Sequence, residues 1–393
     1  MNPLYLKNYY IDRIVPFFLF SLFFVLLLEW ALKTTNLGYT FFDFLLFGKI
    51  TNIIRPFIFL LFLTKLFIEK KYKFIVYCIF FFVFCTISHA HSKSWMLFDL
   101  FYLPFILLHF FSIDKIYFFL FYWLLCFFVV IASLDLMGWS FSSEIFKRNN
   151  IDSFVIRRSL GFSHPNAVGY FLMIISMIYY LKGNIVKKFD FVIFLSLSFF
   201  VFWVPNSWSS SIILFLLSCV SFVHRFYKSI YITFSSFKIV FTIILFALIL
   251  WVSLIWIIAF FDLFRENISA ISSTLWARFS LGEAGVNKFG IKFFGQLISF
   301  KPEDGGFPID STYFVMPIVD GLVPSLFFLC FFSFALARGI FDYKYKYVFV
   351  LLLCLLYGVS EGICGSLFVF LFLPTIDYLI KVIQEKIKDS NAY

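Results

Sequence analysis

Long apolar stretches alternate with short polar segments along almost the whole chain, and this pattern predicts membrane-spanning helices. Most stretches have about 17–25 residues, the length with which a helix crosses a hydrocarbon core of roughly 30 Å. Backbone groups in lipid must bond within their own segment, and the stretches lack the two-residue alternation of barrel strands, so helices are favoured. We predict about twelve spans, over residues 14–32, 50–68, 74–90, 96–112, 116–136, 164–181, 189–205, 208–224, 239–261, 311–336, 346–360 and 363–380. The expected fold class is an all-α polytopic integral membrane protein, a single membrane domain over residues 1–393.

The basic residues between the spans predict an orientation. If the N-terminus lies inside, the short outer loops hold only Lys33, Lys49 and Lys93, and the inner segments hold most of the other short-loop lysines and arginines. The positive-inside rule therefore places both termini in the cytoplasm. Two long loops, 137–163 and 262–310, then lie on the extracytoplasmic side.

Composition narrows the possible functions. Only 14% of the residues are charged and 62% are hydrophobic, whereas soluble domains carry about 25% charged residues. The formal net charge of +10 falls largely in short loops and no zinc-finger or RNA-binding motif is present, so we expect no nucleic-acid partner. The seven cysteines lie in or beside apolar stretches without a C-x-x-C pair, which indicates packing.

Charged residues inside a membrane are expensive, and in this chain they gather near the predicted outer ends of the spans. This group comprises Glu29, Arg55, Asp99, Asp135, Arg157, Arg158, His164, Asp310 and Glu361. Taken singly, each is explained by an interfacial side chain that reaches water. Six tryptophans (Trp30, Trp95, Trp139, Trp203, Trp208 and Trp276) also lie at outer boundaries. They are consistent with an interfacial aromatic belt or with a platform for sugar rings.

The stretch RRSLGFSHPNAVGYF, residues 157–171, has the features of an anion site at a helix start. Pro165 suits the first helical turn, which places His164 near the N-cap and Asn166 in the first turn. The N-terminal N–H groups and the positive end of the helix dipole favour an anion there. Arg157 and Arg158 lie close by, and arginine binds phosphate oxygens through two parallel hydrogen bonds. We predict a site for a lipid phosphate or diphosphate.

The second long loop contains a matching element. Residues 272–289, SSTLWARFSLGEAGVNKF, begin with serines that can cap a helix, and their apolar residues have helical spacing. Gly282 and Gly285 weaken the pattern, so we expect a brief amphipathic helix that carries Trp276 and Arg278. An irregular loop lying on the lipid headgroups is the alternative. The chain then runs through a Gly/Pro-rich turn to Asp310.

These stretches resemble the O-antigen polymerase and ligase superfamily, and most closely the Wzy-type polymerases of capsule and exopolysaccharide clusters. The first stretch is similar to their Arg–Gly–Phe–x–His/Asn–Pro–Asn–x–x–Gly segment, and residues 276–298 to an outer-loop segment with an Arg before a Phe–Gly turn. DSTYFVMPIVDGLVPSLFF, 310–328, is similar to their Asp–x–x–Tyr helix, which adds Tyr313. YGVSEGICGSLFVFLFLP, 357–374, is similar to their Glu-containing turn. Trp208 stands where many members have an arginine.

The resemblance implies a fold similar to C-type glycosyltransferases and an inner-membrane enzyme that polymerises oligosaccharide units linked to undecaprenyl pyrophosphate. A flippase and a chain-length regulator are possible partners. As catalytic residues we expect Arg158 and Arg278 on the leaving diphosphate, and His164, Asp310 and Glu361 around the acceptor hydroxyl. As substrate-binding residues we expect Arg55, Arg157, Asn166, Trp276 and Tyr313. No Asp-x-Asp or His-rich cluster suggests a cation, so we expect no metal or other cofactor.

Three alternatives stay open at this point. His164 and Asp310 are also explained as simple helix caps. A ligase of the same superfamily, which transfers a finished glycan, is barely separable from a polymerase by sequence. A flippase or transporter of the lipid-linked unit would contain broken helices, and Pro317, Asp320 and Pro324 suggest one break.

Overall fold

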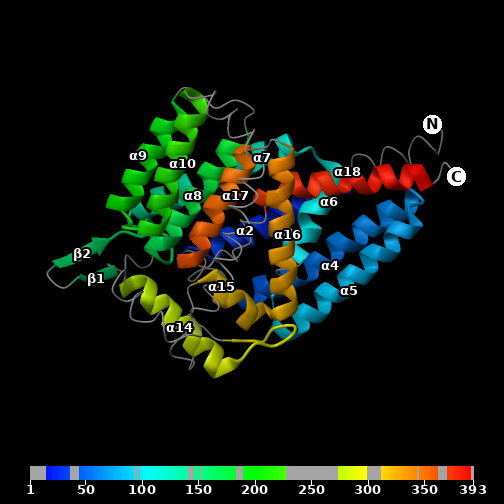
Figure 1. Ribbon diagram of the computed structural model, residues 1–393, viewed down its shortest axis with the longest axis horizontal. Coiled ribbons are helices and arrows are strands. Elements are labelled where there is room, and N and C mark those ends of the chain that lie inside the picture. The colour runs from blue at the N-terminus through cyan, green and yellow to red at the C-terminus, as the bar shows by residue number, and fades with distance from the viewer. Residues whose placement is uncertain are drawn as a thin grey trace.

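A computed structural model describes residues 15–35, 44–92, 94–95, 98–139, 146–150, 153–182, 189–226, 273–298, 311–342, 345–361 and 370–390 (Figure 1). Helices dominate this part of the chain. Six of them are long and apolar enough to cross a membrane, as expected of a multi-pass membrane protein. The predicted span 239–261 lies outside the described residues, and twelve spans with cytoplasmic termini stay a prediction.

Among the described residues of the N-terminal part there are five α-helices and one π-helical segment. They are α2 (Val15–Leu32), α4 (Phe44–Ile68), α5 (Tyr72–Ser92), η2 (Phe98–Tyr102), α6 (Leu103–Phe110) and α7 (Ile113–Leu136). Within the predicted span 96–112, a π-helical segment runs directly into α6. A π-helical turn occupies 98–102 and α6 has only eight residues. Such π-helical turns are rare and occur frequently at functional sites.

Three helices from the middle of the chain, α8 (Pro165–Lys182), α9 (Asp190–Trp203) and α10 (Trp208–Phe226), pack together with α17 (Tyr345–Ser360) from its C-terminal part. Figure 1 shows them side by side. Most residues of α8 are buried, so this helix forms the middle of the group. It approaches α10 closely at Gly169, where an added Cβ would lie 2.6 Å from Oγ of Ser207.

The first long loop contains a β-hairpin, which the all-α prediction did not include. Strands β1 (Phe146–Asn150) and β2 (Ser153–Arg157) pair antiparallel, with Phe146 opposite Arg157. The hairpin leads directly into the turn before α8. Its position matters because β2 ends at one of the predicted site residues.

The predicted span 311–336 is broken. It consists of α15 (Thr312–Val315), the π-helical segment η5 (Met316–Asp320) and, after Gly321, the long helix α16 (Leu322–Phe341). Gly321 has φ = 103°, and its backbone touches that of Gly295. The N–H groups of Leu322 and Val323 donate to the carbonyls of Lys292 and Phe293. The break therefore docks onto the end of the second long loop.

The second long loop forms a helix that is longer than predicted. Helix α14 (Ser273–Phe289) continues through both glycines for 17 residues. Gly282 lies against the ring of Phe314, where a side chain would collide, so close packing with α15 explains this glycine. The prediction of a helix was confirmed and the expected brevity was wrong.

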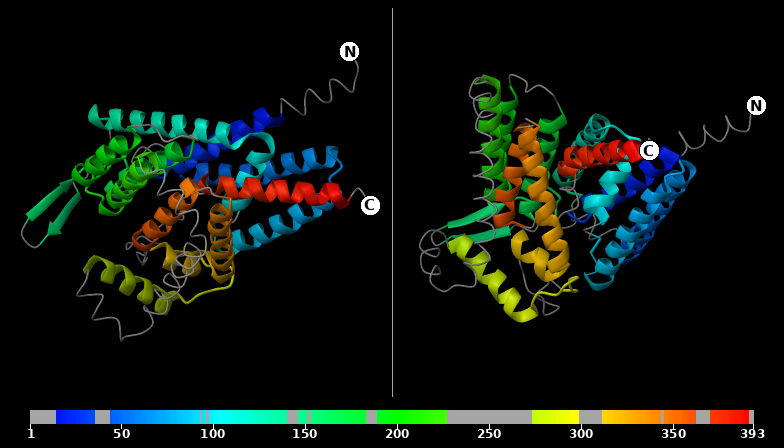
Figure 2. Two further views of the ribbon diagram at one scale, coloured as in Figure 1. Left: turned by 45° about the horizontal axis from the view of Figure 1, so that its top comes forward. Right: turned by 45° about the vertical axis from the view of Figure 1, so that its right-hand side comes forward.

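The C-terminal helix differs from the predicted last span, 363–380. Helix α18 (Leu373–Ser390) begins ten residues after that span's predicted start and extends beyond its end. Its last three turns are rich in charged residues, including Lys381 and Lys386. Figures 1 and 2 show α18 starting next to α16 and running away from it, and contacts join α18 to α6, α7 and α16.

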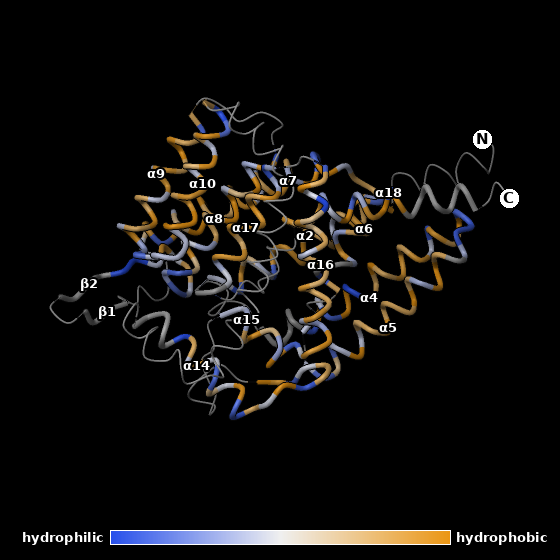
Figure 3. The backbone as a smooth tube through the Cα atoms, viewed as in Figure 1, coloured by the Kyte–Doolittle hydropathy of each residue, from blue (hydrophilic) through white to orange (hydrophobic). Residues whose placement is uncertain are grey.

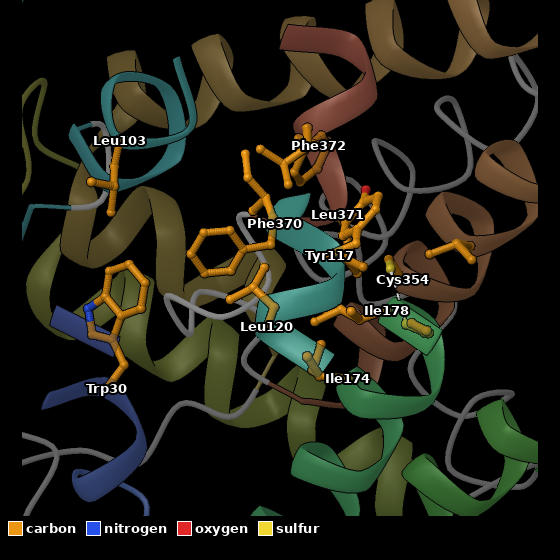
Figure 4. Packing of buried hydrophobic residues seen from close by; sticks show 14 of the residues in the cluster. Trp30, Leu103, Tyr117, Leu120, Ile174, Ile178, Cys354, Phe370, Leu371 and Phe372 are labelled. Atoms are coloured by element: carbon orange, nitrogen blue, oxygen red, sulfur yellow. Dashed lines mark hydrogen bonds between the residues drawn. The ribbon is translucent and has the colours of Figure 1, made fainter. Parts of the chain in front are cut away.

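Apolar residues both fill the interior and cover much of the outside. Figure 4 shows the packed interior, in which Trp30 lies against Phe370, 5.8 Å between ring centroids. Figure 3 shows hydrophobic residues along most of α4, α5 and α9. Phe80 on α5 is 77% exposed, which suits a side chain that faces lipid.

Candidate functional site

The residues before α8 form a tight turn that is fastened on three sides. Leu160 and Gly161 both adopt positive φ, at 46° and 80°. A Cβ on Gly161 would lie 2.9 Å from the side chain of Ile131, so the turn sits directly against α7. The N–H of Arg158 donates to the carbonyl of Val204, and the N–H of Ser163 donates to the carbonyl of Thr34. The ends of α2, α7 and α9 therefore meet at the start of α8.

At the start of α8 the polar side chains interlock. The N–H of Asn166 donates to Nδ1 of His164 at 3.1 Å, so His164 caps the helix. The guanidinium of Arg157 donates to the side-chain oxygen of Asn166 at 2.5 Å and to the carbonyl of Pro205 at 3.0 Å. Arg157 thus joins the hairpin, α8 and the turn between α9 and α10.

The carboxylate of Glu361, just after α17, collects donors from three other helices. Its Oε1 accepts from Nη2 of Arg278 at 3.0 Å, from Nδ2 of Asn166 at 3.3 Å and from Oγ of Ser209 at 3.4 Å. Its backbone carbonyl accepts from the hydroxyl of Thr312 at 2.8 Å. One residue therefore joins α8, α10, α14 and α15. We call Arg157, His164, Asn166, Ser209, Arg278 and Glu361 the polar site.

Of the two terminal nitrogens of the Arg278 guanidinium, one is hydrogen-bonded to a described residue and the other is not. Nη2 pairs with Glu361, whereas Nη1 is buried and has no hydrogen-bond partner among the described residues. The side chain is 14% exposed. A buried, unsatisfied guanidinium N–H is costly, about 1–3 kcal/mol or more for a charged group, and such a group usually marks a bound ion, a ligand or a water. Nη1 is therefore the donor to which an anion would bind.

The remaining predicted site residues lie in different surroundings. Arg158 is exposed at the edge of the polar site, and no hydrogen bond or ion pair of its side chain is found within the described residues. Tyr313 is buried and donates to the carbonyl of Leu355 at 2.9 Å, and its substrate-binding role stays a prediction. Asp310 and the side chain of Trp276 lie outside the described residues.

Arg55 is also not part of the polar site. It is 4% exposed and donates two parallel hydrogen bonds, of 2.8 and 2.9 Å, to the carboxylate of Asp99. Glu29 lies 3.6 Å from Arg55 and pairs with Lys33 at 2.7 Å. We call Glu29, Lys33, Arg55 and Asp99 the charge cluster. The contacts of this guanidinium are therefore with carboxylates of the charge cluster, and the substrate-binding role of Arg55 stays a prediction.

The outer tryptophans do not behave as one set. Trp30 is buried at 5% exposure, and Trp95 stacks on His89 with 4.2 Å between ring centroids. Trp139, Trp203 and Trp208 are exposed at the ends of α7, α9 and α10. Trp208, which stands where an arginine was expected, hydrogen-bonds Asn206. Trp139, Trp203 and Trp208 thus have the exposure that a belt or a sugar platform requires, and the side chain of Trp276 lies outside the described residues.

The sequence analysis missed Ser209 and Thr312. Ser209 belongs to the run NSWSSSIIL, in which every serine looked alike, and only the helix rotation selects the one that faces Glu361. Within the described residues, no group of three or more His, Cys, Asp or Glu side chains is placed to hold a metal ion.

The arrangement offers one chemistry clearly. A guanidinium with an uncommitted N–H and the N-terminal end of an 18-residue helix meet at a carboxylate that also accepts from an amide and a hydroxyl, and the exposed Arg158 precedes this helix in the chain. These groups suit an anion with several oxygens, such as a phosphate or diphosphate. No protein-family model, no curated protein and no solved structure matches this chain.

Proposed function

We propose that this protein is a membrane glycosyltransferase that polymerises oligosaccharide units carried on undecaprenyl pyrophosphate, on the outer leaflet of the cytoplasmic membrane. The observation that carries the proposal is Nη1 of Arg278, which is buried beside the helix start of α8 and has no hydrogen-bond partner among the residues that the structure describes. A diphosphate oxygen satisfies this donor. The resemblance of residues 157–171 to the polymerase segment supports the same assignment.

In the proposed reaction the acceptor hydroxyl oxygen bonds to the anomeric carbon of the donor sugar. The bond between that carbon and the diphosphate oxygen breaks, and the diphosphate leaves with the bonding electrons. Arg278 and Arg158 stabilise the charge that develops on the leaving oxygens. The hydroxyl proton goes to the departing diphosphate, since a good leaving group needs no strong base. Glu361, whose carboxylate also accepts from Asn166, holds Arg278 in place.

A transporter of the same lipid-linked unit is the second candidate, because the predicted tenth span is broken at Gly321. Broken helices frequently form transporter binding sites. Here, however, the N–H groups of Leu322 and Val323 at the break are already occupied by loop carbonyls. This observation favours the glycosyltransferase.

A deletion strain separates these functions. Loss of a polymerase leaves surface glycan of a single repeat unit, whereas loss of a ligase leaves a ladder of long chains on the lipid carrier. Loss of a flippase traps single units on the cytoplasmic face. We expect the first outcome by gel and mass analysis of the lipid-linked fraction.

The site itself is tested by substitution in that strain. We expect Arg278→Ala and Arg158→Ala to abolish long-chain glycan at normal protein abundance. Arg278→Lys should not restore it fully, because lysine lacks the planar fork. Arg338→Ala is the matched control, since Arg338 pairs with Asp342 at the far end of α16. Full-length glycan from both alanine variants of the site would remove the proposal.

A further inference from the structure

We infer that the charge cluster positions the polar site, by fixing the last turn of α2 against the turn that begins α8. The inference concerns how the site is held, and its activity test rests on the proposed function. Three buried charges, Glu29 on α2, Arg55 on α4 and Asp99 on η2, are a costly feature in an apolar protein, and within the described residues none of them contacts the polar site. Their influence must therefore act through the backbone.

Glu29 ties the end of α2 to two neighbouring elements. It lies one turn before the end of the helix, and its carboxylate contacts Lys33 in the following turn at 2.7 Å. Arg55, held by two hydrogen bonds to Asp99 at the start of α6's π-helical turn, approaches the same carboxylate at 3.6 Å. The orientation of α2's last turn is thus set by charges from α4 and η2.

The end of α2 then binds the turn before α8. The carbonyl of Thr34 accepts the N–H of Ser163 at 2.9 Å and its hydroxyl at 3.2 Å. Thr35, completely buried, forms an isolated antiparallel bridge with Phe162. His164, which follows Ser163, caps α8. It accepts from the N–H of Asn166, whose side chain contacts Glu361. The path from Glu29 to the polar site therefore runs through consecutive, hydrogen-bonded residues.

The burial of Glu29 explains why a charge at this position fixes the last turn of α2. Its side chain is 3% exposed and its Oε2 has no hydrogen-bond partner in the described chain, so the negative charge depends on Arg55 and Lys33. A neutral side chain at this position loses that attraction. Asp99 still holds Arg55, so the helix pair α4–η2 stays intact while α2's last turn is released.

The first experiment uses Glu29→Gln in lipid nanodiscs and measures amide hydrogen exchange over residues 159–166. We expect exchange there to be about tenfold faster than in the wild type, because the segment opens more often when a charged contact is removed. Asp377→Asn, which removes an exposed ion pair with Lys381 on α18, is the matched control and should leave this segment unchanged. If Glu29→Gln does not accumulate, Lys33→Met replaces it, since Lys33 is half exposed.

The second experiment adds Thr34→Cys and Ser163→Cys to Glu29→Gln. The bridge between Thr35 and Phe162 places these two residues opposite each other, about 4.5–5.5 Å apart at Cα, within reach of a disulfide. We expect the oxidised variant to regain slow exchange and glycan length, and a reductant to remove both gains. If Glu29→Gln only lowered the overall stability of the protein, a disulfide at this one segment would not restore slow exchange and glycan length.

Unchanged exchange over 159–166 in Glu29→Gln and Lys33→Met, or no response to the disulfide, overturns the inference. Exchange does not depend on the reaction. If Arg278→Ala leaves long glycan intact while Glu29→Gln still speeds exchange, the proposed function fails and the positioning role stands.

Discussion

Replacing Gly282 with alanine has two opposite effects on the stability of the protein, one on helix formation in α14 and one on its packing. Alanine is the better helix former, which alone stabilises a helix by about 1 kcal/mol. The new Cβ, however, would lie 2.7 Å from Cδ1 of Phe314 and closer still to two other atoms of that ring. Ordinary carbon contacts are about 3.5–4.0 Å, so the helix and the ring must separate by roughly 1 Å.

The steric cost of the added methyl group should exceed the gain in helix propensity. Phe314 is completely buried and packs with Ile298 and Ile318, so its ring cannot turn aside. Forcing an extra methyl group into such a place costs about 1–3 kcal/mol. Arg278 lies one turn before Gly282, on the same side of α14. A shift of about 1 Å stretches its 3.0 Å contact with Glu361 beyond hydrogen-bond length.

We therefore expect Gly282→Ala to lower the melting temperature of the purified protein and, in the proposed reaction, to reduce polymer formation roughly 100-fold, the scale of a 1 Å misplacement. Ala284→Val is the matched control, because Ala284 is exposed on the same helix and should tolerate the added volume. Phe314→Leu in the Gly282→Ala background should recover part of the activity. A more stable Gly282→Ala protein with full activity would refute the packing of α14 on α15.

Three further predictions are simpler. Tyr313→Phe should lower the free energy of unfolding by about 1 kcal/mol through loss of the hydrogen bond to Leu355, while glycan length stays normal. Ser209→Ala should reduce the polymerisation rate by less than about tenfold, since it removes the longest of the three contacts to the carboxylate of Glu361. Burial raises the pKa of Glu69, but the hydrogen bond and charge of Lys71 outweigh burial, so the pKa lies below its ordinary 4.5. The stability from this pair is fully present above pH 4.5 and is lost as pH falls through the lowered pKa, a loss that thermal unfolding of Glu69→Gln should not show.

Much of the membrane architecture followed from the one-dimensional pattern. Length and hydropathy identify a helix crossing lipid because the backbone must bond internally, whatever its neighbours are. The bounds of α2, α7, α8 and α10 agree with the predicted spans within a few residues. The same reasoning placed Pro165 at the first position of α8, where a missing N–H has no cost.

The sequence-based predictions failed where contacts with distant parts of the chain determine the local structure. The π-helical turn at 98–102 positions Asp99 against Arg55, a partner 44 residues earlier that no local pattern reveals. The glycines of α14 looked like helix breakers because propensity counts only local entropy. One of them instead allows close contact with Phe314. Isolated charged residues such as Arg55 and Arg278 read alike in the sequence, and only their surroundings separate them.

The sequence by itself determined that this is a helical membrane protein, where most helices begin and end, and that polar residues gather near one set of helix ends. These properties depend on the solvent and on local backbone geometry. Only the tertiary structure decided which charges meet: Arg278 joins Glu361 and Asn166 in the polar site, whereas Arg55 is neutralised in the charge cluster. Pairing depends on distances of a few ångströms between segments far apart in the chain, because charge attraction and hydrogen bonding act only at that range in a packed interior.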